Sequence, residues 1–98
     1  MTPEAKVKAR VKKILKDSGC YWFMPATGGY GQSGVPDFIA CIQGMFLAIE
    51  CKAGKGKLIY LQMDHLSRIE KNGGRVLVAN EENADFVAAC LKVLSAQK

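Results

Sequence analysis

The spacing of hydrophobic positions changes along this chain, and each change predicts a change of secondary structure. Near the start, the apolar residues fall on one stripe of a helix: Val7, Val11, Ile14 and Leu15. Thr2 can cap this helix, with Pro3 at its first position, where a backbone N–H is not needed. The chain is therefore expected to begin with an amphipathic helix.

Short continuous apolar runs follow and predict strands. The run from Cys20 to Met24 ends at Pro25, and two further runs, 37–42 and 45–52, are separated only by Gln43-Gly44. A two-residue loop that ends in glycine favours a tight β-hairpin. The second and third strands are therefore expected to form one antiparallel pair.

The hairpin fixes which residues face each other. If Gln43 and Gly44 form the loop, Ile42 lies opposite Met45, and the pairing continues along the strands until Asp37 lies opposite Glu50, with Cβ atoms roughly 5 Å apart. Side chains alternate between the two faces of a strand, so Asp37, Glu50 and Lys52 share one face. Two carboxylates and an ammonium group are thus predicted at one end of a hairpin.

The rest of the chain completes an α/β pattern. A helical stripe over about 59–71 is closed by Asn72-Gly73-Gly74, and 75–79 is typical of a strand. Asn80 can cap a final helix with these residues facing inward: Phe86, Val87, Cys90, Leu91 and Leu94. The 98 residues are expected to form one domain, with the order helix, three strands, helix, strand, helix.

Composition narrows the class of protein. No apolar run approaches the roughly 20 residues of a membrane span, and the N-terminal segment is basic and amphipathic rather than a signal peptide. The four cysteines show no C-x-x-C spacing, which favours reduced core thiols. We expect a cytoplasmic protein, of a bacterial or phage-infected cell, without membrane contact.

The charge distribution points to a polyanionic partner. The net charge is +5, and six of the 14 cations lie between Lys6 and Lys16 on the first predicted helix. A solvated basic face that only keeps the protein soluble explains this cluster equally well.

The paired carboxylates require an explanation of their own, because like charges on opposite rungs destabilise a sheet. A divalent cation would offset the repulsion, and hard oxygen ligands suit Mg²⁺ or Mn²⁺. Lys52 could then hold an attacking water or stabilise a phosphate in its transition state. The alternative is an exposed hairpin end with an ordinary Glu/Lys pair.

These residues resemble the PD-(D/E)XK nuclease superfamily and, within it, the small VRR-NUC domains. The resemblance rests on Gly34-Val35-Pro36-Asp37, on Glu50-Cys51-Lys52, on Gln62 and on Glu4 in the first helix. It implies a restriction-endonuclease-like fold, with a mixed central sheet flanked by helices. It also implies that Asp37, Glu50 and the backbone carbonyl of Cys51 bind the metal, that Lys52 is catalytic, and that Glu4 and Gln62 complete the site.

Stand-alone proteins of this kind resemble Holliday junction resolvases that work as symmetric dimers, so the resemblance implies branched DNA as substrate and a homodimer. The candidate DNA contacts are basic residues off the apolar stripe of the first helix, a tyrosine in the glycine-rich loop before Asp37, and two lysines just past Lys52: Lys6, Arg10, Lys13, Tyr30, Lys55 and Lys57.

The sequence leaves other functions open. The chain could be a nuclease that acts on flaps or ends, or a module that binds nucleic acid on a nuclease fold without cutting it. It could also be a small domain whose acidic hairpin end binds a protein partner, which predicts no salt-dependent affinity for DNA.

Overall fold

The computed structural model describes residues 1–26 and 33–96, and its element order is the predicted one. The helices are α1 (Pro3–Ser18), α2 (Tyr60–Lys71) and α3 (Ala84–Ala96). The strands are β1 (Tyr21–Phe23), β2 (Phe38–Ile42), β3 (Met45–Cys51) and β4 (Arg75–Ala79). The predicted αβββαβα arrangement is confirmed.

The strands form a mixed sheet in the order β1-β2-β3-β4. The first three strands are antiparallel neighbours, and β4 runs parallel to β3. The hairpin has the predicted register, from Ile42 opposite Met45 to Phe38 opposite Ile49. Its turn places Gln43 at φ 50° and Gly44 at φ 79°, the left-handed geometry whose twist matches that of the flanking strands.

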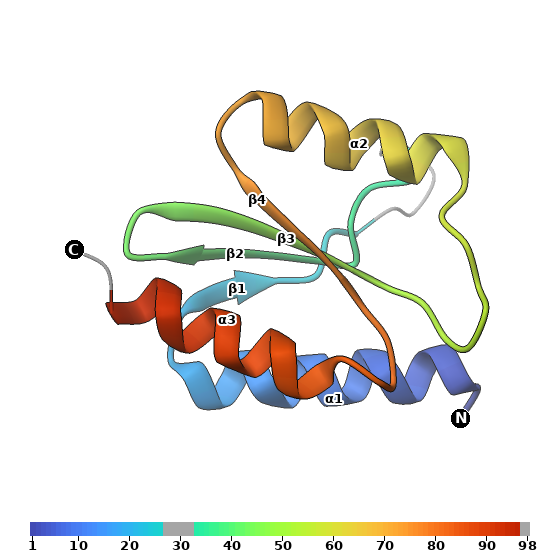
Figure 1. The fold of residues 1–98 in the computed structure, drawn as a ribbon, viewed down its shortest axis with the longest axis horizontal. Helices are drawn as coiled ribbons and strands as arrows, with labels where there is room; N and C mark the ends of the chain where they lie inside the picture. The colour runs from blue at the N-terminus through green and yellow to red at the C-terminus, as the bar shows by residue number, and fades with distance from the viewer. Residues whose placement is uncertain (27–32, 97–98) are drawn as a thin grey trace.

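The sheet lies between two helical layers (Figure 1). Helices α1 and α3 lie side by side on one face, and α2 crosses the other. The main core fills the α1/α3 side, where these side chains are buried: Val7, Val11, Leu15, Phe38, Ala40, Ile49, Val87 and Leu91. The hydrophobic stripe of the first helix is therefore the surface that packs on the sheet, and this packing fixes the position of the N-terminal helix beside the end of the hairpin.

Both ends of α1 are terminated by local hydrogen bonding, as the sequence predicts at its start. The Thr2 side chain Oγ1 accepts a hydrogen bond from the Ala5 N–H at 3.1 Å. At the other end Gly19 adopts φ 75°, and its N–H bonds to the Lys16 carbonyl.

Two details of the C-terminal half differ from the prediction. Asn80 does not cap α3, because its side chain organises the preceding turn by accepting from the N–H groups of Glu82 and Asn83. The helix begins only at Ala84, and Phe86 is 60% exposed rather than inward, since α3 is apolar around much of its circumference and the sheet covers only one side.

The four cysteines are free, as expected, but the prediction that they are core thiols is wrong for Cys41, which is exposed on β2; Cys51 is buried, and Cys20 and Cys90 are partly buried. Within residues 1–26 and 33–96, no helix has the length and hydropathy that crossing a bilayer requires.

Candidate active site

Asp37 and Glu50 meet where β2 and β3 reach the end of their pairing. Asp37 immediately precedes β2, one rung beyond the Phe38–Ile49 pair, so the continued register places it opposite Glu50. Asp37 Oδ2 accepts a hydrogen bond from the Cys51 backbone N–H at 2.8 Å. This bond holds the Asp37 carboxylate against β3 at the residue after Glu50, and Asp37 is close enough to act on the Glu50 carboxyl.

Glu50 is an acid in an unusually dry position. It is 2% exposed, and its Oε2 atom has no hydrogen-bond partner among the described residues. Burial raises the pKa of Glu50 to about 8, and both a hydrogen bond to Asp37 and the negative charge of Asp37 act in the same direction. Because a buried polar atom without a partner is costly, this carboxyl marks a position built for something other than packing.

Lys52 lies just beyond Glu50, at the end of β3. Its backbone N–H donates to the Ala79 carbonyl at 2.9 Å, which extends the pairing of β3 with β4 and anchors the residue. The positive charge of Lys52 opposes the other influences and lowers the pKa of Glu50. The lysine is therefore close enough for its charge to act on that carboxyl.

Helix α1 contributes two residues to this cluster, one predicted and one missed. Lys8 Nζ lies 3.6 Å from Glu4 Oε2 on the same helix and 3.5 Å from Asp37 Oδ1. Desolvation lowers the pKa of Lys8, but the attraction of Asp37 and Glu4 outweighs it, so the net shift is upward. The available signal was helical spacing, because Lys8 follows Glu4 by one turn and shares its face.

The Gln62 backbone lies against Gly34, in the segment that leads to Asp37, while its side chain has a structural role. Its Oε1 accepts from the Ile59 N–H at 3.0 Å, which satisfies a free donor at the start of α2. Among the described residues, the Gln62 side chain hydrogen-bonds to the Ile59 N–H and to no group of the site. The predicted completion of the site by Gln62 therefore stays a proposal.

Gly34 explains how α2 is docked beside the segment that leads into Asp37. It adopts φ 79°, and a Cβ atom there would lie 2.7 Å from the Leu61 carbonyl carbon and 3.0 Å from the Gln62 nitrogen. Only glycine allows this approach. One step earlier, the Ser33 carbonyl lies 3.1 Å from His65 Nε2, a second tie between the segment and α2.

Cys51 can offer only its main chain to a ligand. Its side chain is 1% exposed, and burial, with the negative charges of Asp37 and Glu50, raises the pKa of the Cys51 thiol to about 12. The thiol is therefore neutral at physiological pH. In the part of the chain that the structure describes, no three His, Cys, Asp or Glu side chains are arranged around a common ion position.

Comparison with known proteins agrees with this geometry. The sequence matches the family of archaeal Holliday junction resolvases (Hjc) over residues 5–89. The chain belongs to the Hjc family. A solved structure described as a VRR_NUC domain has the same fold, with a TM-score of 0.75 and 22% sequence identity, over 91% of this chain and 97% of the other. No curated protein sequence matches the chain significantly.

The Hjc match and the VRR_NUC fold confirm the predicted nuclease family. The matched segment, 5–89, contains Asp37, Glu50 and Lys52 and ends within α3. The chain is thus a nuclease of the Holliday-junction-resolvase type.

The basic residues predicted to contact DNA fall into separate groups on this Hjc-type fold. Arg10 pairs with Asp85 at 3.2 Å, and Lys13 pairs with Asp17 at 3.0 Å. Lys6 and Arg10 line a cavity of about 380 Å³ that α1 shares with the start of α3. At 3.6 residues per turn these cations project from a different side of α1 than Glu4.

The remaining predicted contacts lie on loops. Lys55 and Lys57 are exposed on the connection between β3 and α2, directly after Lys52. Tyr30 lies outside the described residues.

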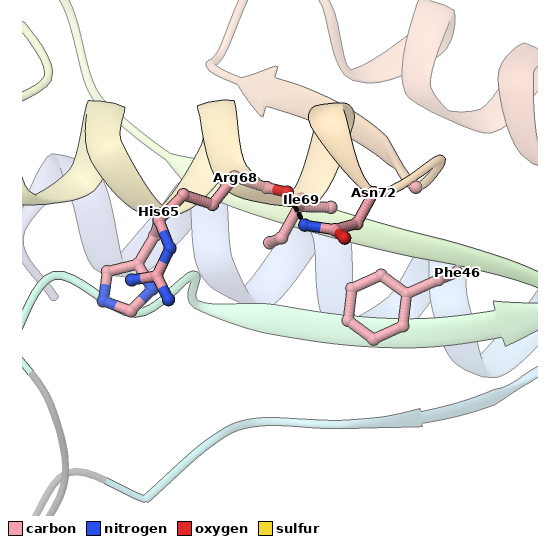
Figure 2. Close-up of a pocket in the computed structure, with 6 residues that line it drawn as sticks. Phe46, His65, Arg68, Ile69 and Asn72 are labelled. Carbon is pink, nitrogen blue, oxygen red and sulfur yellow. Dashed lines mark hydrogen bonds between the residues drawn. The ribbon is translucent and has the colours of Figure 1, made fainter.

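A second cavity, of about 400 Å³, lies away from the carboxylates, between α2 and the start of β3 (Figure 2). Its lining includes Phe46, His65, Arg68, Ile69 and Asn72. The Asn72 side chain donates to the Arg68 carbonyl at 2.8 Å and terminates α2, while His65 contacts Ser33. Because these polar groups serve the ends and docking of α2, the cavity is a packing feature.

Proposed function

We propose that this Hjc-family chain is a divalent-metal-dependent, structure-specific DNA endonuclease that hydrolyses phosphodiester bonds in Holliday junctions. One observation carries the proposal. The buried carboxyl of Glu50, with an oxygen that no described residue satisfies, lies beside Asp37 and within the field of Lys52. A carboxyl pair in this setting is the arrangement that a cation would stabilise.

The donor set fits Mg²⁺ or Mn²⁺. Asp37, Glu50 and the Cys51 backbone carbonyl would hold the ion, and all three offer hard oxygen atoms. The neutral, buried Cys51 thiol argues against a thiolate-preferring metal at this position. When bound, the ion would supply Lewis-acid stabilisation of the negative charge that develops on the phosphate.

The chain's own residues would do the rest of the chemistry. Lys52, anchored by its backbone bond to Ala79, would present its ammonium group to the attacking water or to a phosphate oxygen. Deprotonated Glu50 and Asp37 would orient the reacting groups at the end of the hairpin. We propose that Glu4 and Gln62 complete the site, Glu4 through its contact with Lys8 and Gln62 from the start of α2.

DNA would reach the site across exposed cations. Lys55 and Lys57 follow Lys52 on an exposed loop, where phosphates that flank the scissile one would pass. We propose further phosphate contacts by Lys6, Arg10 and Lys13, and stacking by Tyr30. Phosphate contacts carry no sequence information directly, so the proposed specificity is for the shape of the junction.

A Holliday junction has strands to be cut in symmetric pairs, and a two-fold dimer would supply a site for each. Closed two-fold pairing is the commonest assembly of small proteins. Edge strand β1 offers apolar surface for such a contact, since Tyr21 is 71% exposed and Phe23 is 44% exposed. We propose a homodimer, which sedimentation would show as twice the 10.7 kDa chain mass.

The test compares DNA substrates and matched variants. Linear duplex, flapped and four-way DNA of the same sequence are incubated with the protein in Mg²⁺, in Mn²⁺ and in EDTA. Glu50→Gln keeps the shape of the side chain, and Glu82→Gln removes the same charge from an exposed position in the turn before α3. We expect cleavage of the four-way DNA by the wild type and Glu82→Gln in either metal, none in EDTA, and binding without cleavage by Glu50→Gln.

Each alternative leaves a different result. Equal cutting of linear and four-way DNA would reject the junction specificity while retaining the nuclease. Preferred cutting of flaps would redirect the substrate assignment. Full activity of Glu50→Gln, or binding with no cleavage in either metal, would overturn the assignment of the site.

A further inference from the structure

Lys8 is the one cation in the described site that bridges two acids from different elements. Its ammonium group lies between Glu4, one turn earlier on α1, and Asp37, the residue immediately before β2. Asp37 has a second partner, because its other oxygen accepts from the Cys51 N–H. Both oxygens of the Asp37 carboxylate are therefore engaged within the protein.

The Lys8 contacts are of similar length and both are long. Distances of 3.5 and 3.6 Å exceed the roughly 2.7–2.9 Å of a strong charge-assisted hydrogen bond. The Lys8 side chain is also 35% exposed, so water can reach it. The ammonium group is thus held by attraction to both carboxylates, without a tight bond to either, and it can leave along its flexible side chain.

We propose that Lys8 is a resident counter-ion, which neutralises Glu4 and Asp37 in the metal-free protein and is displaced from Asp37 when a divalent cation binds. The proposal rests on the proposed metal dependence. Lys8 is then a positioning residue, since it acts through Asp37.

A bound ion and the Lys8 ammonium group would compete for a single carboxylate oxygen. Among the described residues, Asp37 Oδ2 already accepts a hydrogen bond from the Cys51 N–H, which leaves Oδ1 as the oxygen without a backbone donor. The ammonium group contacts that same Oδ1, and two cations at this separation repel each other. Lys8 therefore opposes ion binding, and it raises the metal concentration that the enzyme needs.

An ordinary helix ion pair predicts something different. If Lys8 only stabilised α1 through Glu4, its removal would weaken folding by the same amount whether or not metal is present, and it would leave the metal affinity unchanged. The contact with Asp37, which belongs to another element, is what separates the two interpretations.

The experiment measures Mn²⁺ binding to the chelator-treated full chain by titration calorimetry, without DNA. Lys8→Met removes the ammonium group, and Lys12→Met removes the same charge from an exposed position one turn further along α1. We expect Lys8→Met to bind Mn²⁺ about three- to tenfold more tightly than Lys12→Met. Lys8→Arg, which keeps the charge, should restore the wild-type affinity.

Thermal unfolding of the same variants provides the second readout. In EDTA, Lys8→Met should melt below Lys12→Met, and saturating Mn²⁺ should narrow the gap because the ion replaces the lost counter-charge. Unchanged or weaker Mn²⁺ binding by Lys8→Met, with a constant gap in melting temperature, would overturn the role of Lys8 while leaving the metal site intact. Absence of Mn²⁺ binding by the wild type would instead reject the proposed metal dependence. If Lys8→Met does not fold, Lys8→Gln decides by the same measurements.

Discussion

The metal-free protein should become less stable as pH rises, because the buried carboxyl of Glu50 then loses its proton. The pKa of this carboxyl is raised from 4.5 to about 8 in the folded state, first by burial and then by Asp37. The folded state therefore retains a proton that the unfolded chain releases. The stabilisation associated with this proton is complete below pH 4.5, and it is lost as pH rises towards 8.

The magnitude follows from the size of the shift. One pKa unit corresponds to about 1.4 kcal/mol, so raising the pH from 5.5 to 8 should lower the free energy of unfolding by about 3 kcal/mol through Glu50 alone. For a chain of this length, that loss corresponds to a fall in melting temperature of more than about 10 °C. Burial of the carboxyl, which is 2% exposed, keeps solvent from screening this effect.

Other groups also titrate in this interval, so the assay compares the wild type with Glu50→Gln. The amide has the shape of the protonated acid and does not ionise. Urea unfolding in EDTA at pH 5.5, 7 and 8.5 should show the wild type losing about 3 kcal/mol relative to the variant. If the free energies of unfolding of the two proteins run parallel across this range, the reasoning about Glu50 is refuted. Saturating Mg²⁺ should oppose the loss, because an ion would take the place of the proton.

Two further predictions concern the backbone around the hairpin. Gly34→Ala should lower the free energy of unfolding by about 2 to 4 kcal/mol, because the new Cβ would meet the Leu61 backbone at 2.7 Å and the backbone has a left-handed conformation. A change below about 0.5 kcal/mol in urea unfolding would contradict the docking of this segment on α2. Gln43→Asn should stabilise the protein by about 0.5 to 1 kcal/mol, because asparagine tolerates the φ of 50° in this turn; a lower melting temperature would argue against the turn geometry.

The parts of the fold that the sequence predicts well are those set by local rules. The two-residue loop at Gln43-Gly44 fixes the hairpin register, and the register alone brings Asp37 to the rung of Glu50. The stripe through Val7 and Val11 predicts both the first helix and the face that it buries. In these cases a short-range pattern has one favourable solution.

Other features depend on tertiary packing, which no local pattern specifies. The apolar residues of α3 surround much of the helix, so the sequence could not show that Phe86 would stay exposed while Val87 is buried. The Gln62 side chain has the hydrogen-bonding groups of a site residue, but its Oε1 accepts a hydrogen bond from the Ile59 N–H instead. Lys8 belongs to the cluster because α1 docks with its first turns beside Asp37, a contact between residues 29 positions apart.

Glu50 and Lys8 are linked through the charges that surround Asp37. In the metal-free protein, the Lys8 ammonium group contacts Glu4 and Asp37, and burial beside Asp37 favours the protonated form of Glu50. A divalent cation held by Asp37 and Glu50 would favour loss of the Glu50 proton and departure of the Lys8 ammonium group, because each places positive charge beside the same carboxylates. Metal affinity should therefore rise with pH in the wild type, and Lys8→Met should need a smaller rise in pH to reach the same affinity. Identical pH profiles of Mn²⁺ affinity for Lys8→Met and Lys12→Met would show that the two cations do not compete for the same carboxylates.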